Sequence, residues 1–143
     1  VNISLESSMR YRARPAASTI LGWLEQSEEA RKSLTSNTQE LSTALSWLSE
    51  FIIKNANHKF VQVWGNGAAF DCGILRNSYS LTGQPVPWQW WNDRDVRTIV
   101  ELGKVIGFDP KRDMPFKGTR HNALDDAIHQ AKYVSAIWKK LAK

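Results

Sequence analysis

The chain has 143 residues, 42% of them hydrophobic and seven of them tryptophan, which is enough apolar material for one domain with a buried core and argues against long disorder. Its net charge of +5 favours an acidic partner such as nucleic acid, although many soluble proteins carry a similar excess. The single cysteine, Cys72, excludes an internal disulfide and suits a reducing cytoplasm, and no apolar run of about 18 residues is present to span a membrane.

The first half of the chain predicts one strand followed by helices. Val1 to Glu6 alternates apolar and polar side chains, as in a half-buried strand. A basic loop over residues 9–17 follows, and Ser18 and Ser27 are placed to cap two short helices. The apolar positions between Leu41 and Ile52 fall at helical spacing and indicate an amphipathic helix.

The middle of the chain returns to a strand and then to helices. Phe60 to Trp64 is predicted to be a strand, and Ala69 to about Leu81 a helix. Trp88 to Trp91 is short and aromatic, and we expect it to be extended. Asn92 or Asp93 can cap the helix that comes next.

A polar loop with two prolines, residues 109–118, leads to the last helix, which is expected to begin near Asn122. The apolar stripe of that helix is predicted to comprise Leu124, Ala127, Ile128, Ala131, Val134, Trp138 and Leu141. The order of strands and helices predicts an α/β layer architecture in a single domain, residues 1–143.

Two stretches concentrate side chains that suit metal chemistry. In the first, the predicted strand ends at Gly65-Asn66-Gly67, where glycines allow a sharp turn and a close approach of a ligand, and Asp71 follows in the first turn of a helix. Stabilisation of the helix dipole explains Asp71 equally well. Asn66 at such a position is more often a turn residue than a ligand contact.

The second stretch places His121 before the last helix, with Asp125 and Asp126 in its first turns. At about 100° per residue, the two aspartates lie on opposite margins of the apolar stripe, so periodicity does not decide which one faces a site. Taken alone, a surface histidine and a solvated first turn are the simpler interpretation. Asp93 and Asp95 are also explained more simply by capping and buried hydrogen bonds than by metal binding.

Taken together and in this order, Asn66–Asp71 and His121–Asp126 resemble the second and third motifs of the DEDDh 3′→5′ exonucleases, a family with a ribonuclease H-like fold. The segments Thr19–Gln26 and Asn92–Thr98 are similar to those of a short bacterial and phage branch labelled exodeoxyribonuclease VIII-like or exoribonuclease-like. The resemblance selects Asp126 over its neighbour, because the family's aspartate lies five residues after its histidine.

The resemblance implies a mixed sheet flanked by helices and a 3′→5′ exonuclease that releases nucleoside 5′-monophosphates from the 3′ ends of single-stranded DNA or RNA. It implies two Mg²⁺ or Mn²⁺ ions, with Asp71 and Asp126 among their ligands and His121 as the general base. The residues expected to contact the nucleic acid are Asn66, Gly67, Phe70 and Arg120. A homodimer is also consistent with the resemblance.

One motif of the family has no counterpart here. Its first motif is Asp-x-Glu on the opening strand, and no Asp-x-Glu precedes Asp71. Ser4-Leu5-Glu6 is a poor substitute because serine is a weak metal ligand. We therefore expect that the N-terminal strands of the fold are missing from this chain, and that these 143 residues alone are inactive or nearly so.

Two further interpretations stay open. One is a nucleic-acid-binding or assembly protein that has the same fold but has lost catalysis. The other is a hydrolase of small nucleotides or short oligonucleotides. Trp88, Trp90 and Trp91 could stack on unpaired bases, but packing at a strand edge or a subunit interface is the simpler explanation. The sequence does not distinguish DNA from RNA as the substrate.

Overall fold

The computed structural model describes residues 1–118 and 122–142, apart from the side chain of Ser33. The chain divides into two compact units: unit 1 comprises Val1–Val61 and Gly73–Asn92, and unit 2 comprises Gln62–Cys72 and Asp93–Lys143. The expectation of a single domain stays a prediction. Among the described residues, no helix has both the length and the apolar character that crossing a membrane requires.

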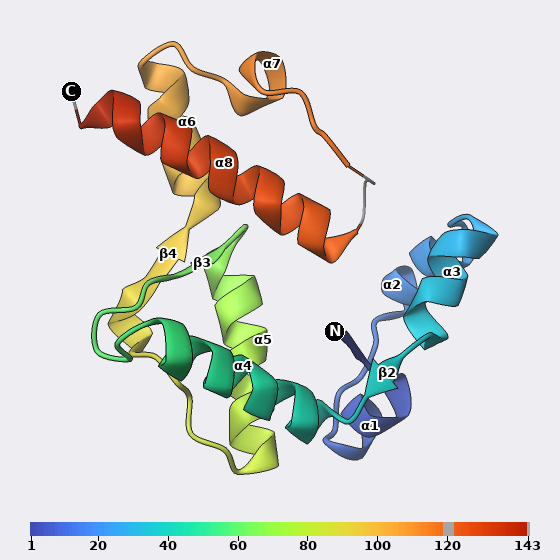
Figure 1. The fold of residues 1–143 in the computed structure, drawn as a ribbon. Coiled ribbons are helices and arrows are strands. Elements are labelled where there is room, and N and C mark those ends of the chain that lie inside the picture. The colour runs from blue at the N-terminus through green and yellow to red at the C-terminus, as the bar shows by residue number, and fades with distance from the viewer. Residues whose placement is uncertain (119–121, 143) are drawn as a thin grey trace. The chain divides into compact units, whose positions relative to one another are not determined.

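Unit 1 is mostly helical, with one small parallel sheet in which β1 pairs with β2. Its elements are β1 (Asn2–Ile3), α1 (Leu5–Arg10), α2 (Ala17–Leu24), α3 (Glu28–Thr35), β2 (Thr38–Gln39), α4 (Leu41–Asn55), the larger part of α5 (Ala68–Thr82) and a 3₁₀ helix, Trp90–Asn92 (Figure 1).

The predicted strand Val1–Glu6 is wrong beyond Ile3. The Ser4 side chain accepts a hydrogen bond from the backbone N–H of Ser7 at 3.2 Å, so the chain enters α1 instead. A helix cap satisfies a backbone donor locally, and here it overrides the two-residue alternation of apolar side chains. The capping prediction for Ser27 is confirmed, since its hydroxyl accepts from Ala30 N–H, whereas α2 begins one residue before Ser18.

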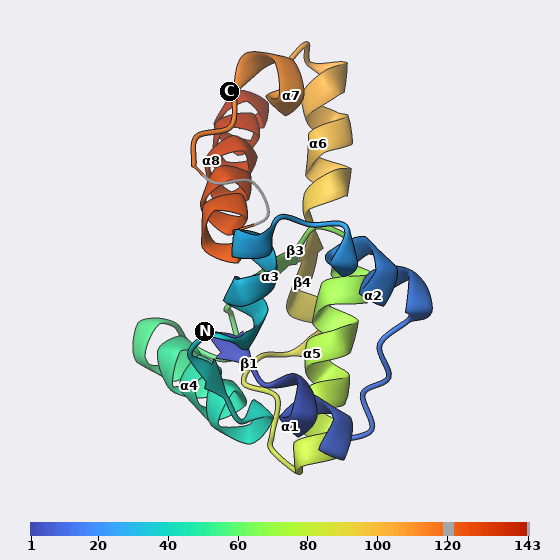
Figure 2. The same ribbon diagram turned by 90° about the vertical axis from the view of Figure 1, so that its right-hand side faces the viewer.

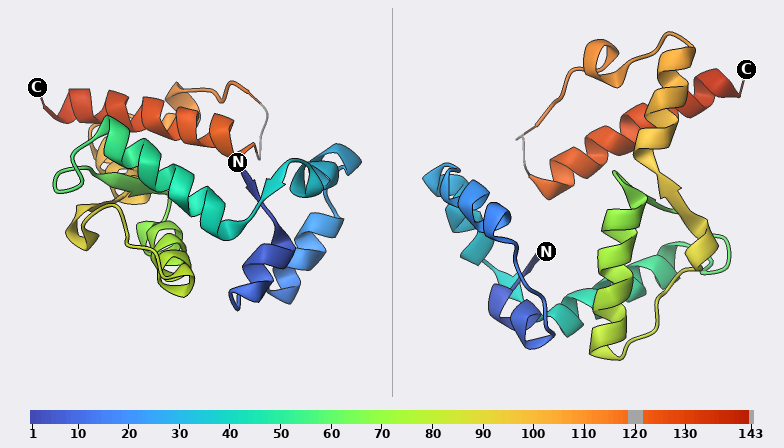
Figure 3. Two further views of the ribbon diagram at one scale, coloured as in Figure 1. Left: turned by 60° about the horizontal axis from the view of Figure 1, so that its bottom comes forward. Right: turned by 180° about the vertical axis from the view of Figure 1, so that it is seen from behind.

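Helix α4 confirms the predicted amphipathic helix and packs against α5 (Figure 3). Leu45 of α4 is buried, and its carbonyl accepts a hydrogen bond from the fully buried Tyr79 hydroxyl of α5 at 3.0 Å. Trp88 is buried against the Tyr79 ring in an edge-to-face contact. The expectation of an extended Trp88–Trp91 segment is wrong, because Trp90 begins a 3₁₀ turn.

Unit 2 contains a two-stranded parallel sheet, formed by β3 and β4, together with helices. Its elements are β3 (Val63–Gly65), the first residues of α5, β4 (Asp93–Asp95), α6 (Val96–Val105), α7 (Pro110–Asp113) and α8 (Ala123–Leu141). Strand β3 pairs with β4 so that Val63 is opposite Asp93 and Gly65 opposite Asp95. A mixed α/β architecture is therefore confirmed at this level.

Some boundaries in unit 2 differ from those expected. The cap of α6 is Asp95, because Asn92 and Asp93 precede or belong to the strand β4. The loop over residues 109–118 contains a short helix, α7, which Asp109 caps. The predicted start of the last helix is confirmed. The Asn122 side chain accepts hydrogen bonds from the backbone N–H groups of Leu124 and Asp125, at 3.1 and 3.2 Å.

The core of unit 2 lies between α6 and α8, which pack side by side (Figure 2). Its buried members are Val96, Ile99, Tyr133 and Ile137. A Cβ on the buried Gly103 of α6 would lie 2.9 Å from Ile137 Cδ1, so this glycine lets the two helices approach closely.

The apolar stripe predicted for α8 is wrong as the buried face of that helix. Tyr133 and Ile137, which are not part of it, are the residues buried against α6. Leu124 is 67% exposed and Trp138 59% exposed. Helix α8 therefore has two apolar faces, of which the predicted one lies mostly uncovered among the described residues.

Candidate functional site

The turn after β3 brings α5 against the end of the strand. Gly67 has φ +102°, a left-handed conformation that strongly favours glycine. A Cβ on Gly65 would lie 2.9 Å from the Asp71 Cβ and 3.0 Å from its Oδ2. Only glycine permits this approach, so the sequence Gly65-Asn66-Gly67 places Asp71 directly beside the C-terminal end of β3.

A single carboxylate fixes the start of two helices. Asp95, at the end of β4, accepts through Oδ1 from Thr98 N–H at 3.0 Å and through Oδ2 from Ala68 N–H at 2.6 Å. The bond from Ala68 is the main reason that the pKa of Asp95 lies below its usual value. The expectation that capping explains this aspartate is confirmed, although its bond to a second helix far away in the sequence carries no local signal.

Asn66 is held by a cation from α6. Arg97 Nε donates to Asn66 Oδ1 at 3.3 Å, and its guanidinium carbon would lie 3.6 Å from a Cβ on Gly67. Phe70, in the first turn of α5, is 71% exposed and so available for contact. The assignment of Asn66, Gly67 and Phe70 to nucleic-acid binding stays a prediction.

The two neighbouring aspartates of α8 have different surroundings. Asp126 lines a cavity of about 790 Å³ together with Asn66. Asp125 instead lies against Gly118, where a Cβ would be 2.7 Å from its Cγ. Sequence periodicity could not separate the two residues, and this geometry fits the choice of Asp126. His121 and Arg120 lie outside the described residues.

The carboxylates of Asp71 and Asp126 are hard oxygen donors of the kind that Mg²⁺ and Mn²⁺ prefer. Among the residues that the structure describes, no three His, Cys, Asp or Glu side chains gather where they could share a metal ion. The donor type therefore fits a divalent cation, but the number of donors is small. A site with four carboxylates needs two more than this pair supplies.

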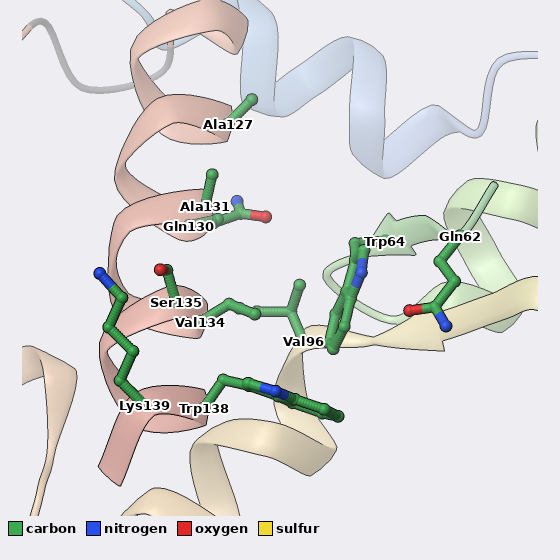
Figure 4. Close-up of a pocket in the computed structure, with 10 residues that line it drawn as sticks. All are labelled: Gln62, Trp64, Val96, Ala127, Gln130, Ala131, Val134, Ser135, Trp138 and Lys139. Atoms are coloured by element: carbon green, nitrogen blue, oxygen red, sulfur yellow. The ribbon is translucent and has the colours of Figure 1, made fainter. Parts of the chain in front are cut away.

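A second cavity in unit 2, of about 550 Å³, lies between β3 and α8 (Figure 4). Figure 4 shows the rings of Trp64 and Trp138 and the side chain of Val134 directed into it. Ala127 and Ala131 belong to the same face of α8, so the cavity floor is the uncovered apolar stripe.

The 3′-5′ exoribonuclease Rv2179c-like domain family matches residues 1–138. The chain belongs to this family. It is also similar to the exodeoxyribonuclease of Enterobacteria phage T4, with 32% identity over 133 residues that cover 78% of this chain and 56% of the relative. The chain thus spans about half the length of that relative. No solved structure matches it.

The Rv2179c-like family and the phage relative both carry the names of exonucleases. The family is named for RNA and the phage relative for DNA, so the two names do not agree on the type of nucleic acid. The ribonuclease H-like arrangement and the DEDDh subtype stay predictions.

Proposed function

We propose that this domain belongs to a metal-dependent 3′→5′ exonuclease that hydrolyses single-stranded nucleic acid from its 3′ end to nucleoside 5′-monophosphates. One observation carries the proposal. Asn66 and Asp126, from two motifs that are far apart in the sequence, line the same cavity, and Asp71 of α5 lies against Gly65, the residue before Asn66. A cytoplasmic location and a homodimer are part of the same proposal.

Asp71 and Asp126 would hold the cations, and His121 would act as the general base. Two bound divalent ions would supply an activated water and stabilise the charge on the leaving oxygen. Arg97 keeps Asn66 in place beside the strand end, which lets that amide position the terminal nucleotide. Histidine is the side chain that most often removes a proton from a reacting group in enzymes.

The remaining two acids would come from an Asp-x-Glu strand in a ribonuclease H-like sheet. Among the described residues β3 pairs with β4 alone, so one of its backbone edges has no strand partner there. The apolar cavity between Trp64 and α8 adjoins β3 and offers apolar surface against which a further element would pack. Both features support the arrangement that the resemblance implies.

The small number of donors favours one alternative. If no further carboxylates join Asp71 and Asp126, cations bind weakly and the domain serves as a nucleic-acid-binding or assembly module. The two functions share a substrate class but differ in their response to metal. Turnover that requires Mg²⁺ or Mn²⁺ belongs to the enzyme alone.

The deciding experiment uses the natural full-length protein with labelled single strands, either free or blocked at the 3′ end, under a Mn²⁺ titration. Asp71→Asn and Asp126→Asn are expected to abolish hydrolysis by weakening metal binding. His121→Ala should leave Mn²⁺ bound and slow the reaction by roughly 10²- to 10⁴-fold. Asp125→Asn, with the same charge change on the adjacent residue, is the matched control.

Equal cleavage of free and blocked strands would argue against an exonuclease. Loss of activity in Asp125→Asn but not in Asp126→Asn would reverse the assignment of the two aspartates. The 143-residue chain alone is expected to be inactive or nearly so, and turnover at an ordinary enzymatic rate would refute the need for further acids.

A further inference from the structure

The cavity that Asn66 and Asp126 line is also lined by aromatic and charged side chains that belong to neither motif. It lies wholly within unit 2, with walls from α6, α7, α8 and the loop before α8. Its volume of about 790 Å³ falls in the range that accommodates a small ligand such as a nucleotide. Its wall also carries features that suit the two halves of a nucleotide, the base and the phosphate.

Three aromatic rings form a ladder along this wall. The Phe116 and His129 ring centroids are 5.1 Å apart with planes at 68°, and those of His129 and Tyr133 are 5.3 Å apart at 80°. Tyr133 is buried in the core and anchors the ladder, while the other two rings are half-buried. Aromatic rings held in this way offer a surface on which any base can stack.

One cation in the lining is uncommitted among the described residues. Lys104 pairs with Glu101 at 2.7 Å, and Arg97 is hydrogen-bonded to Asn66. Lys111 is exposed, and the described residues give its ammonium group no ion pair or hydrogen bond. Its neighbour Asp109 uses a carboxylate oxygen to accept from the Lys111 backbone N–H at 3.0 Å, as the cap of α7.

We propose that this cavity is a nucleotide-binding subsite for the single-stranded substrate, with the base against Phe116 and His129 and a phosphate at Lys111. The inference rests on the proposed function, because Asp126 and Asn66 connect the cavity to the proposed site of hydrolysis. It identifies residues that neither catalytic motif contains. Stacking does not depend on which base is present, and the flexible Lys111 ammonium group contacts only the phosphate. The subsite is therefore expected to bind nucleotides with any base.

The test measures binding of AMP and thymidine 5′-monophosphate to the full-length protein by calorimetry, with ribose 5-phosphate and inorganic phosphate as base-free probes. Phe116→Ala and His129→Ala should each weaken nucleotide binding about tenfold and leave ribose 5-phosphate unaffected. Phe116→Leu keeps the bulk without the aromatic ring and should weaken binding likewise. Lys111→Gln should weaken all four probes.

Two controls match these changes in chemistry. Phe51→Ala removes an exposed ring from unit 1, and Lys139→Gln removes an exposed ammonium group from the other cavity. Neither should alter binding. Unchanged binding in both Phe116 variants, or base-free probes that bind as tightly as nucleotides, would overturn the proposal.

The two proposals fail separately. If the Phe116 variants lose nucleotide binding while no metal-dependent hydrolysis is found, the subsite stands and the exonuclease does not. If Asp71→Asn abolishes hydrolysis while the Phe116 variants bind and degrade single strands as the wild type does, the exonuclease stands and the subsite does not. Circular dichroism of each variant establishes that it is folded.

Discussion

Asp95 provides a sharp test of how unit 2 is built, because one side chain stabilises the start of two helices. Asp95→Ala removes the bond to Thr98 in the first turn of α6 and the bond to Ala68 at the start of α5. The pairing of β4 with β3 is made by the backbone and does not use the Asp95 side chain. The expected result is therefore a loss of stability together with displacement of the helix that carries Asp71.

The magnitude follows from the two bonds. Loss of an N-cap costs about 1 kcal/mol. A hydrogen bond to a charged group contributes roughly 1.5–3 kcal/mol, and the lower end applies because Asp95 is only half-buried. Asp95→Ala should thus destabilise the protein by roughly 2–3 kcal/mol. Asp95→Asn keeps a capping oxygen for Thr98 but turns an amide donor toward Ala68, so it should cost roughly 1–2 kcal/mol.

The assay is urea unfolding followed by far-ultraviolet circular dichroism and tryptophan fluorescence. Glu50→Ala is the control, because it removes the same charge from an exposed position in α4 and should change stability by no more than about 0.5 kcal/mol. An Asp95→Ala variant as stable as this control would refute the role of the carboxylate as a shared cap.

The effect should also depend on pH. The folded protein holds the pKa of Asp95 below the reference value of 3.8, chiefly through the bond from Ala68. The unfolded chain then binds more protons near that pH, so the stabilisation is complete above about 3.8 and is lost as the pH falls through the lower folded pKa. The difference between wild type and Asp95→Ala should shrink in acid.

Three other substitutions test the packing. Gly65→Ala should destabilise the protein by roughly 1–3 kcal/mol and weaken Mn²⁺ binding, because the new Cβ would lie 2.9 Å from that of Asp71; urea unfolding and calorimetry measure these effects. Ile137→Ala, at a fully buried position, should cost roughly 2–5 kcal/mol in urea unfolding, and a loss below about 1 kcal/mol would contradict its core role. Ser7→Ala should cost roughly 1–3 kcal/mol by thermal unfolding, since its buried hydroxyl accepts from Leu41 N–H at 2.8 Å; Ser7→Thr, which keeps a hydroxyl, should cost less.

Local signals predicted the helices well where the sequence offers a capping side chain or a periodic apolar face. Ser27 and Asn122 cap α3 and α8 as expected, and the spacing between Leu41 and Ile52 gives α4. The strand β4 escaped prediction because its three residues, Asp93–Asp95, are all charged. Their extended conformation comes from pairing with β3, which is a long-range interaction that no local pattern records.

The candidate site, like the helices, was predictable where the signal is local in the sequence. The glycines around Asn66 indicate a close approach, and the structure shows Asp71 as the group that approaches Gly65. Helical periodicity left Asp125 and Asp126 undecided, and the approach of Asp125 to Gly118 carries no local signal because Gly118 belongs to a different segment. The aromatic ladder was missed because Phe116 comes from a loop and joins the rings of α8 only in three dimensions.

Helix α8 illustrates why an apolar stripe does not by itself identify a buried face. Its residues Tyr133 and Ile137 pack on α6, and Gly103 makes that contact possible by removing a side chain from the path of Ile137. The longer stripe, with two alanines and Trp138, instead lines the cavity beside Trp64. Exposed apolar surface of this kind marks an interaction site in a folded protein. The cavity adjoins β3, and a further strand beside β3 is the arrangement that the proposed four-carboxylate site requires.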